Sequence, residues 1–273
     1  RLLLTDEMRL VLMFEDKFPT TGYIDALPFL VPLEKEGSSI DVLSLGKLGT
    51  LLDTISKILA FLSSVKDGVY PNLTRLALRA RRFPEIGGRI NSILDRYGEV
   101  KDSASPELLS IRRTIRDREG TLSKRAAAIL RKAQDDGYAD KDASVAVRDG
   151  KFLIPVASAS KRKVSGFVYD ESSTGKTTYI EPTEIIDLEN EIRDLRFEES
   201  REIARILREF SEFVRPFIPE LKECACCLGE MDFLMAKAGT ALNHIAGMPV
   251  ISEDGRLELR KARHPLLEKA LRK

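Results

Sequence analysis

The segment 173–177, Ser-Thr-Gly-Lys-Thr, comes closest in this sequence to a known catalytic motif. A phosphate-binding loop needs a glycine, four further residues and then Gly-Lys-Ser/Thr, followed by a helix whose amides bind the phosphates. Here Asp170 stands in the place of the first glycine, where a carboxylate would repel phosphate, and residues 178–180 indicate a strand. The segment therefore predicts a turn between two strands, and a stand-alone nucleotide triphosphatase is the weaker alternative.

The three cysteines, Cys224, Cys226 and Cys227, lie within four residues of one another. A structural zinc site needs four ligands, and no further cysteine or histidine pair is near in the sequence. We therefore expect small buried apolar residues on a helix and no metal. An odd, clustered set of cysteines is not a disulfide framework, which favours a reducing, cytoplasmic location.

Basic residues gather between positions 148 and 176, where six Lys/Arg stand against three Asp/Glu, a net charge of +3. Cations on loops that a rigid scaffold carries suit nucleic-acid phosphates, although such loops are also often only solvated. On the residues alone both interpretations stay open. The candidate nucleic-acid-binding residues are Arg148, Lys151, Lys161, Arg162, Lys163 and Lys176.

The composition predicts a folded protein that does not enter a membrane. The chain has 273 residues, of which 43% are hydrophobic and 32% charged, and its net charge of +1 gives no sign of a nucleic-acid partner. No apolar run is long enough to form a membrane-spanning helix. The sequence begins at Arg1 without a methionine, as an excised segment would.

Two long helices are predicted on either side of a short β segment. Ser105 and Pro106 are a favourable start for the first, whose apolar residues recur at intervals of seven until it ends near Gly137. The second covers 183–214 with one apolar stripe. Residues 107–132 carry eight Lys/Arg and three Asp/Glu (+5), and residues 183–214 carry five and ten (−5). A small β segment between two long amphipathic helices implies that the helices pair antiparallel with the β segment at their tip, and the opposite net charges match this pairing.

Residues 144–181 alternate between apolar and polar side chains, which predicts four strands in an antiparallel meander. Asp149-Gly150 marks the first hairpin, in which both turn residues need a positive φ. The other strands are expected at 164–169 and 177–181. A second hairpin is predicted around Asp254-Gly255, between residues 248–251 and 257–259. The predicted fold is mainly α, with a small antiparallel β insertion.

Four strings of residues resemble the second-type bacterial MutS family. They are GEVKDSASPEL at 98–108, VRDGKFLIPV at 147–156, the segment from Gly166 to Pro182, and ARHPLL at 262–267. Together they cover most of the chain in order. Two positions depart from the family pattern, which often has a small residue where Lys176 stands and a lysine where Ala157 stands.

The resemblance implies a helical core with two long antiparallel lever helices and a β clamp at their tip. The implied divisions are 1–140 for the core and first lever, 141–182 for the clamp, 183–247 for the second lever and return to the core, and 248–273 for the start of an ATPase domain. The family dimerises through that domain, uses ATP and Mg²⁺, often carries an Smr nuclease domain, and is linked to duplex or branched DNA in recombination and repair and to collided ribosomes.

On this interpretation the segment itself holds no catalytic residue and no cofactor. It is a nucleic-acid-binding lever and clamp from an ATP-driven machine. One alternative is a structural coiled-coil arm whose tip binds protein, such as a ribosomal protein. Another is a mismatch-repair MutS of the first type, whose mismatch-reading domain would precede Arg1.

Overall fold

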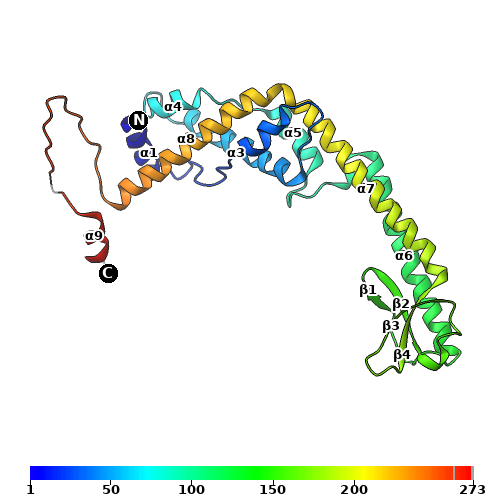
Figure 1. Cartoon of the computed structure of the whole chain (residues 1–273). Helices are drawn as coiled ribbons and strands as arrows, with labels where there is room; N and C mark the ends of the chain where they lie inside the picture. Colours follow the sequence, from blue (N-terminus) through cyan, green and yellow to red (C-terminus); the bar gives the residue numbers. More distant parts are fainter. Residues whose placement is uncertain (261, 272–273) are drawn as a thin grey trace. The chain divides into compact units, whose positions relative to one another are not determined.

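The computed structural model describes residues 1–260 and 262–271, and it is mainly helical with one small antiparallel sheet (Figure 1). The predicted fold class is therefore confirmed. The chain forms two compact units: the first consists of Arg1–Glu99 together with the chain from Leu207 onward, and the second consists of Val100–Ile206. No described helix has the length and apolar character that crossing a bilayer requires.

The first unit is a helical bundle in which α8 packs against α1, α2 and α3. Its core includes Met8, Leu30, Leu48 and Leu221, each fully buried. The Glu7 carboxylate accepts the backbone N–H of Leu73 at 2.8 Å. The helices of this unit are α1 (Leu2–Phe14), α2 (Leu27–Leu33), α3 (Val42–Ser64), α4 (Pro71–Ala77), α5 (Pro84–Ile93), η3 (Arg215–Phe217), α8 (Ile218–Asn243) and α9 (Pro265–Leu271).

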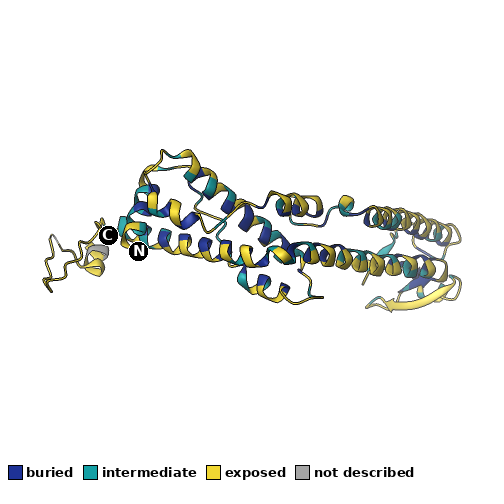
Figure 2. Cartoon of the chain, turned by 90° about the horizontal axis from the view of Figure 1, so that it is seen from above, coloured by how far each residue is buried: buried dark blue, intermediate teal, exposed yellow. Residues whose placement is uncertain are grey.

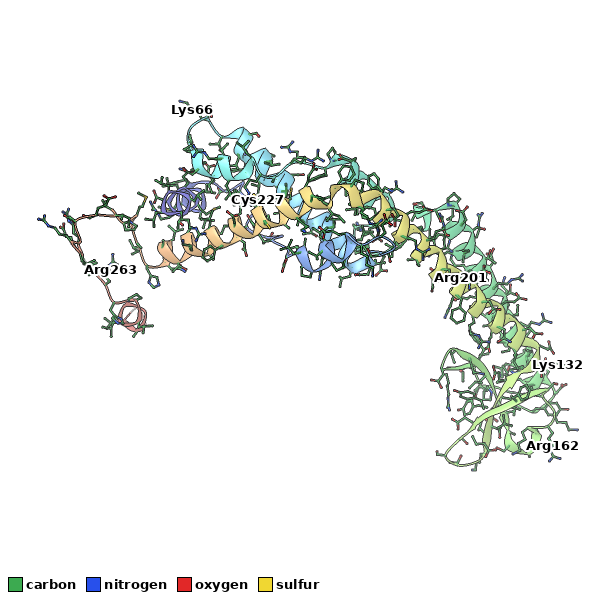
Figure 3. All side chains as sticks on the ribbon, turned by 45° about the horizontal axis from the view of Figure 1, so that its top comes forward. Lys66, Lys132, Arg162, Arg201, Cys227 and Arg263 are labelled. Carbon is green, nitrogen blue, oxygen red and sulfur yellow. The ribbon has the colours of Figure 1, made fainter. Side chains whose placement is uncertain are left out.

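The cysteine segment lies on α8, and burial of two of its three thiols is confirmed. Cys224 and Cys227 are buried, whereas Cys226 is exposed. Figure 3 labels Cys227 on this helix. Burial raises the pKa of the Cys227 thiol to about 11 and also raises that of Cys224. Both thiols therefore stay protonated near neutral pH and behave as small apolar side chains.

The hairpin predicted around Asp254-Gly255 is wrong. Gly255 has the positive φ of a turn, at +73°, but residues 248–260 form no strand. Val250 is 91% exposed and Leu257 84% exposed. A two-stranded hairpin is only marginally stable unless other elements cover its apolar side chains, and none of the described residues does so here.

The second unit contains the predicted helix pair. Its elements are η1 (Asp102–Ala104), α6 (Pro106–Asp135), β1 (Ala146–Arg148), β2 (Lys151–Ala157), η2 (Ser158–Ser160), β3 (Gly166–Glu171), β4 (Thr177–Pro182) and α7 (Thr183–Val214), which continues into the first unit. Ser105 caps α6 as predicted, because its hydroxyl accepts the Leu108 backbone N–H at 3.0 Å.

Antiparallel pairing of α6 with α7 follows from their ion pairs. Arg112 binds Glu199, Arg118 binds Glu191 and Arg125 binds Glu184, so partner numbers fall along α7 as they rise along α6. Between the helices, Leu122 and Ala126 of α6 pack with Ile185, Leu188 and Ile192 of α7. The opposite charges of the two helices thus border an apolar seam, as the sequence predicts.

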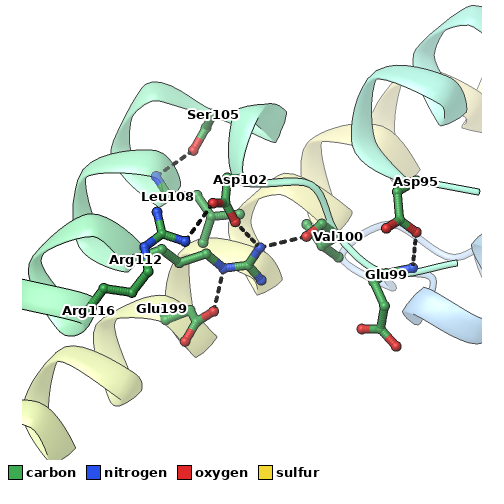
Figure 4. Close-up of polar contacts among 9 residues, drawn as sticks. All are labelled: Asp95, Glu99, Val100, Asp102, Ser105, Leu108, Arg112, Arg116 and Glu199. Carbon is green, nitrogen blue, oxygen red and sulfur yellow. Dashed lines mark hydrogen bonds and ion pairs between the residues drawn. The ribbon is translucent and has the colours of Figure 1, made fainter. Parts of the chain in front are cut away.

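Arg112 makes three hydrogen bonds at the start of this helix pair (Figure 4). Its Nε donates to Glu199 at 2.6 Å, and its Nη1 donates to Asp102 at 2.8 Å and to the Val100 carbonyl at 2.7 Å. Only 22% of the side chain is exposed. One guanidinium therefore ties α6 to α7 and to the segment that leads into α6.

The sheet has the strand order β1-β2-β4-β3, so the predicted meander is wrong in its second half. β2 and β3 each pair antiparallel with β4 and are therefore parallel to each other. The connection 158–165 must run back along the length of the sheet, and its Val164 packs into the core beside Ile154, Val156 and Ile180. A meander needs only a tight turn there, and this connection is too long for one.

Candidate nucleic-acid interface

The β1–β2 hairpin carries two of the six predicted binding residues, Arg148 and Lys151. Its turn is as predicted, with φ of 52° at Asp149 and 77° at Gly150. The Arg148 guanidinium forms an ion pair with Asp170 and lies 4.1 Å from the centre of the Tyr179 ring.

Lys151 is bonded in a similar way. Its ammonium group lies 2.7 and 2.6 Å from the two carboxylate oxygens of Glu181, a residue that is only 7% exposed. These contacts join β1 and β2 to β3 and β4. Arg148 and Lys151 therefore hold the sheet together, and their charges are largely matched within it.

The other four predicted residues lie on the connection 158–165 and on the β3–β4 turn, and we call them the basic end: Lys161, Arg162, Lys163 and Lys176. Ser158 fastens the connection that bears the first three to the β3–β4 turn. Its backbone N–H donates to the Lys176 carbonyl at 3.0 Å, and its hydroxyl donates to the Gly175 carbonyl at 2.7 Å. The start of this connection and the β3–β4 turn therefore lie side by side.

Three members of the basic end are exposed and have no side-chain partner within the described part of the chain: Arg162, Lys163 and Lys176. Arg162 is labelled in Figure 3. Lys161 lies 3.2 Å from Glu171, and both side chains are nearly half exposed. An ion pair so open to solvent contributes at most about 1 kcal/mol. The basic end is therefore a cluster of cations with little internal neutralisation.

The six predicted residues thus form two groups. The two groups lie near each other, since Arg148 and Lys161 bind the adjacent residues Asp170 and Glu171 of β3. The Ser-Thr-Gly-Lys-Thr segment belongs to the basic end as the turn between β3 and β4. Gly175 has a φ of +65°, and Thr177 begins a strand rather than a helix. The turn predicted from the sequence is confirmed.

A carboxylate that sequence reasoning missed lies where the sheet meets α7. Glu189 accepts the backbone N–H of Phe152 at 2.9 Å. Burial raises the pKa of this carboxyl above its ordinary value of 4.5, and the neighbouring Glu181 raises it further. Nothing in the charge pattern of α7 distinguishes Glu189 from the nine other acidic residues of that helix.

We expect Glu189→Gln to gain stability over the wild type as the pH rises. A carboxyl whose pKa is raised by folding favours the folded state below 4.5, and this contribution is lost as the pH rises through the raised value. Glutamine still accepts the Phe152 N–H but carries no charge. Urea unfolding at pH 4, 5.5 and 7 measures the difference, and Glu198→Gln on the exposed side of α7 is the control. A difference that is constant with pH contradicts the expectation.

Two exposed aromatic residues of β3 were also missed, Phe167 and Tyr169. They are 65% and 37% exposed. In the sequence, apolar and polar side chains alternate in β3 much as they do in β4, whose Ile180 is fully buried. The apolar side chains of β3 are more exposed because β3 lies at the edge of the sheet, whereas β4 lies inside it.

Comparison with known proteins identifies the family. No protein-family model matches the chain. Endonuclease MutS2 of Lacticaseibacillus paracasei is 34% identical over 233 residues, which are 85% of this chain and 29% of that protein. Endonuclease MutS2 of Clostridium perfringens is 32% identical over 273 residues, 97% of this chain and 33% of that protein. Endonuclease MutS2 of Streptococcus equi is 33% identical over 263 residues, which are 96% of this chain and 33% of that protein.

The chain belongs to the MutS2 family. The resemblance inferred from the four strings is therefore confirmed, and the first-type MutS alternative is set aside. The chain spans about a third of the length of these MutS2 relatives. All three relatives are named endonucleases.

Proposed function

We propose that the sheet of this MutS2-family chain binds nucleic-acid phosphates through its basic end. The observation that supports the proposal is that Arg162, Lys163 and Lys176 are exposed, have no side-chain partner among the described residues, and lie on two segments that the bonds of Ser158 join. Lys161 adds a fourth cation whose pairing is weak. Arg148 and Lys151 have a structural role in this proposal, because carboxylates of the sheet bind them.

Such contacts position a nucleic acid without reading its sequence. Arginine and lysine bind phosphate oxygens, which every base sequence presents alike, so affinity should depend steeply on salt. The helix pair gives the sheet a rigid base, since Ile154 and Ile180 are buried against Leu130 and Ala133 of α6. The proposed unit is thus a small binding head on a helical arm, the lever and clamp of the family.

For the whole protein, we propose a cytoplasmic, ATP- and Mg²⁺-dependent homodimer that acts on duplex or branched DNA. This rests on the names of the relatives, which are endonucleases, and on the family resemblance. Its ATPase and nuclease domains would lie in the parts of the relatives that this chain does not cover. A ribosome as partner has the same phosphate chemistry. The competing function is a structural arm with a protein-binding tip. The following experiment distinguishes it from binding of nucleic-acid phosphates.

Removing three charges from the basic end should abolish most of the salt dependence of DNA binding. With three phosphate contacts, the slope of log affinity against log salt for duplex DNA should be about −2.7, and Arg162→Ala/Lys163→Ala/Lys176→Ala should bring it near zero. Fluorescence anisotropy of a labelled duplex and a four-way junction, titrated at several NaCl concentrations, measures both slopes.

The control removes the same charge from the first unit: Lys17→Ala/Lys66→Ala/Arg75→Ala, three exposed residues without a described side-chain partner. This variant should keep the wild-type slope. If both triple variants bind as the wild type does, the basic end is only solvated, and the structural arm with a protein partner becomes the better function.

A further inference from the structure

Strand β3 is exposed along its whole length, which is unusual for a strand with apolar residues (Figure 2). Phe167 is 65%, Val168 52% and Tyr169 37% exposed. In the described part of the chain β3 pairs with β4 alone. An exposed apolar edge strand can pair with a strand of another molecule and aggregate, unless a ligand covers it or its geometry prevents the pairing. In β3 a register shift between Val168 and Asp170 disfavours pairing with another strand.

The two rings of β3 lie on the side of the sheet that carries Glu181. Phe167 is directly opposite Glu181, so both side chains project to the same side. Tyr169 is held on the same side, since its hydroxyl donates to the Asp149 carboxylate and its ring centre lies 5.8 Å from the Lys151 ammonium. Phe167 thus offers an open ring beside a fixed tyrosine.

The charges around β3 are arranged for an anionic ligand. Both carboxylates of the strand are matched, Asp170 by Arg148 and Glu171 by Lys161. The three cations without described partners lie on the two segments that flank β3, with Arg162 and Lys163 before it and Lys176 after it. A ligand along β3 therefore meets aromatic rings and a surplus of positive charge.

We propose that β3 is a stacking site for the unpaired bases of single-stranded nucleic acid. Aromatic rings stack on any base, and neighbouring cations follow the backbone phosphates. A duplex gains nothing from the rings because its bases already stack on one another. The site deepens the proposed function and rests on it for the phosphate contacts. Phe167 distinguishes unpaired strands, as at branch points, from duplex.

A fluorescent side chain at the ring position reports stacking directly. The sequence contains no tryptophan, so Phe167→Trp in the full chain introduces a single indole. Titration with a 20-nucleotide oligodeoxythymidine should quench its emission, and a duplex of the same length should not. Phe233→Trp, at a phenylalanine of the first unit that is 61% exposed, should not be quenched by either. Equal quenching by strand and duplex, or none by the strand, overturns the proposal.

Affinities of side-chain variants separate stacking from charge. Phe167→Ala should weaken binding of the oligodeoxythymidine at least about fivefold, as loss of one stacked base does, and leave duplex affinity unchanged. The Arg162, Lys163 and Lys176 variant should weaken both. If only the charge variant has an effect, the proposed function stands and the stacking site fails. If wild type binds neither nucleic acid, both fail.

A second copy of the chain could bind to the exposed edge of β3 in place of nucleic acid, and this alternative has to be excluded. Light scattering of wild type and Phe167→Ala at the same concentrations should give one and the same mass. A wild-type dimer that Phe167→Ala dissociates would assign the edge to contact between copies and overturn the proposal.

Because Phe167 is exposed, Phe167→Ala should leave the unfolding transition unchanged. Phe167→Leu keeps an apolar side chain but has no ring, so it should weaken binding of the single strand as Phe167→Ala does.

Discussion

Replacing Arg112 by alanine should destabilise the helix pair by about 2–4 kcal/mol, because it leaves Glu199, Asp102 and the Val100 carbonyl without their donor. Arg112 and Glu199 are 22% and 25% exposed, so water replaces the lost bonds incompletely. Arg112→Lys should recover only part of the stability, since an ammonium group does not reproduce the fork of donors.

Hydrogen exchange of the full chain locates this effect, because peptides of 106–135 and 183–206 should exchange faster while those of the first unit keep their rates. Arg113→Ala removes the neighbouring, exposed arginine and should change stability by no more than about 0.5 kcal/mol. Equal effects of the two variants would mean that the Arg112 bonds contribute nothing to the pairing of α6 with α7.

The Arg112 effect should also shrink in acid. Hydrogen bonds from Arg112, and next from Arg116, hold the pKa of the Asp102 carboxyl below its ordinary value of 3.8. A lowered pKa stabilises the fold above 3.8, and the contribution is lost as the pH falls through the lowered value. The difference between wild type and Arg112→Ala should therefore be smaller at pH 3 than at pH 7.

Gly166→Ala should detach β3 from the sheet or destabilise the second unit by about 3 kcal/mol. A Cβ at this position would lie 2.7 Å from Cγ2 of Ile180 and 2.9 Å from the carbonyl carbon of Glu181, and closer still to the carbonyl oxygen. The Glu181 backbone belongs to the ladder of β4 and has little room to move. Urea unfolding measures the loss, and faster exchange of the 164–172 peptide identifies the strand affected.

Gly120→Ala is the matched control in the same unit. Nothing lies within 4 Å of a Cβ there, and the residue is exposed inside α6, where alanine stabilises a helix by about 0.5–1 kcal/mol relative to glycine. The two substitutions should thus have opposite signs. If Gly166→Ala is neutral, the close approach of β3 to β4 at this point is not required by the fold.

Local rules were enough to predict the helices and the first turn. Ser105 and Pro106 mark the start of α6 through the chemistry of a helix cap, and Asp149-Gly150 marks a hairpin because few other pairs adopt two positive φ angles. The position of α6 and α7 on either side of a small β segment predicted their pairing, and their complementary charges match it. Each of these signals depends on a few neighbouring residues, or on a period that one helix shows by itself.

The strand order could not be predicted in the same way. No local sequence signal shows whether β3 or β4 lies beside β2. The connection between β2 and β3 is held by Val164, which packs against residues of β2 and β4, and these contacts form only in the folded sheet. For the same reason the six basic residues looked equivalent in the sequence. Their separation into matched and unmatched cations depends on Asp170, Glu171 and Glu181, which the fold brings beside them.

The most direct test of binding by the basic end is a lysine-modification footprint of the full chain with and without a duplex of about 30 base pairs. Acetylation at low reagent concentration, read residue by residue by mass spectrometry, reports which ammonium groups the nucleic acid covers. We expect protection of Lys163 and Lys176, some protection of Lys161, and unchanged modification of Lys17 and Lys66 in the first unit. Protection confined to the first unit, or equal at all lysines, would contradict binding by the basic end.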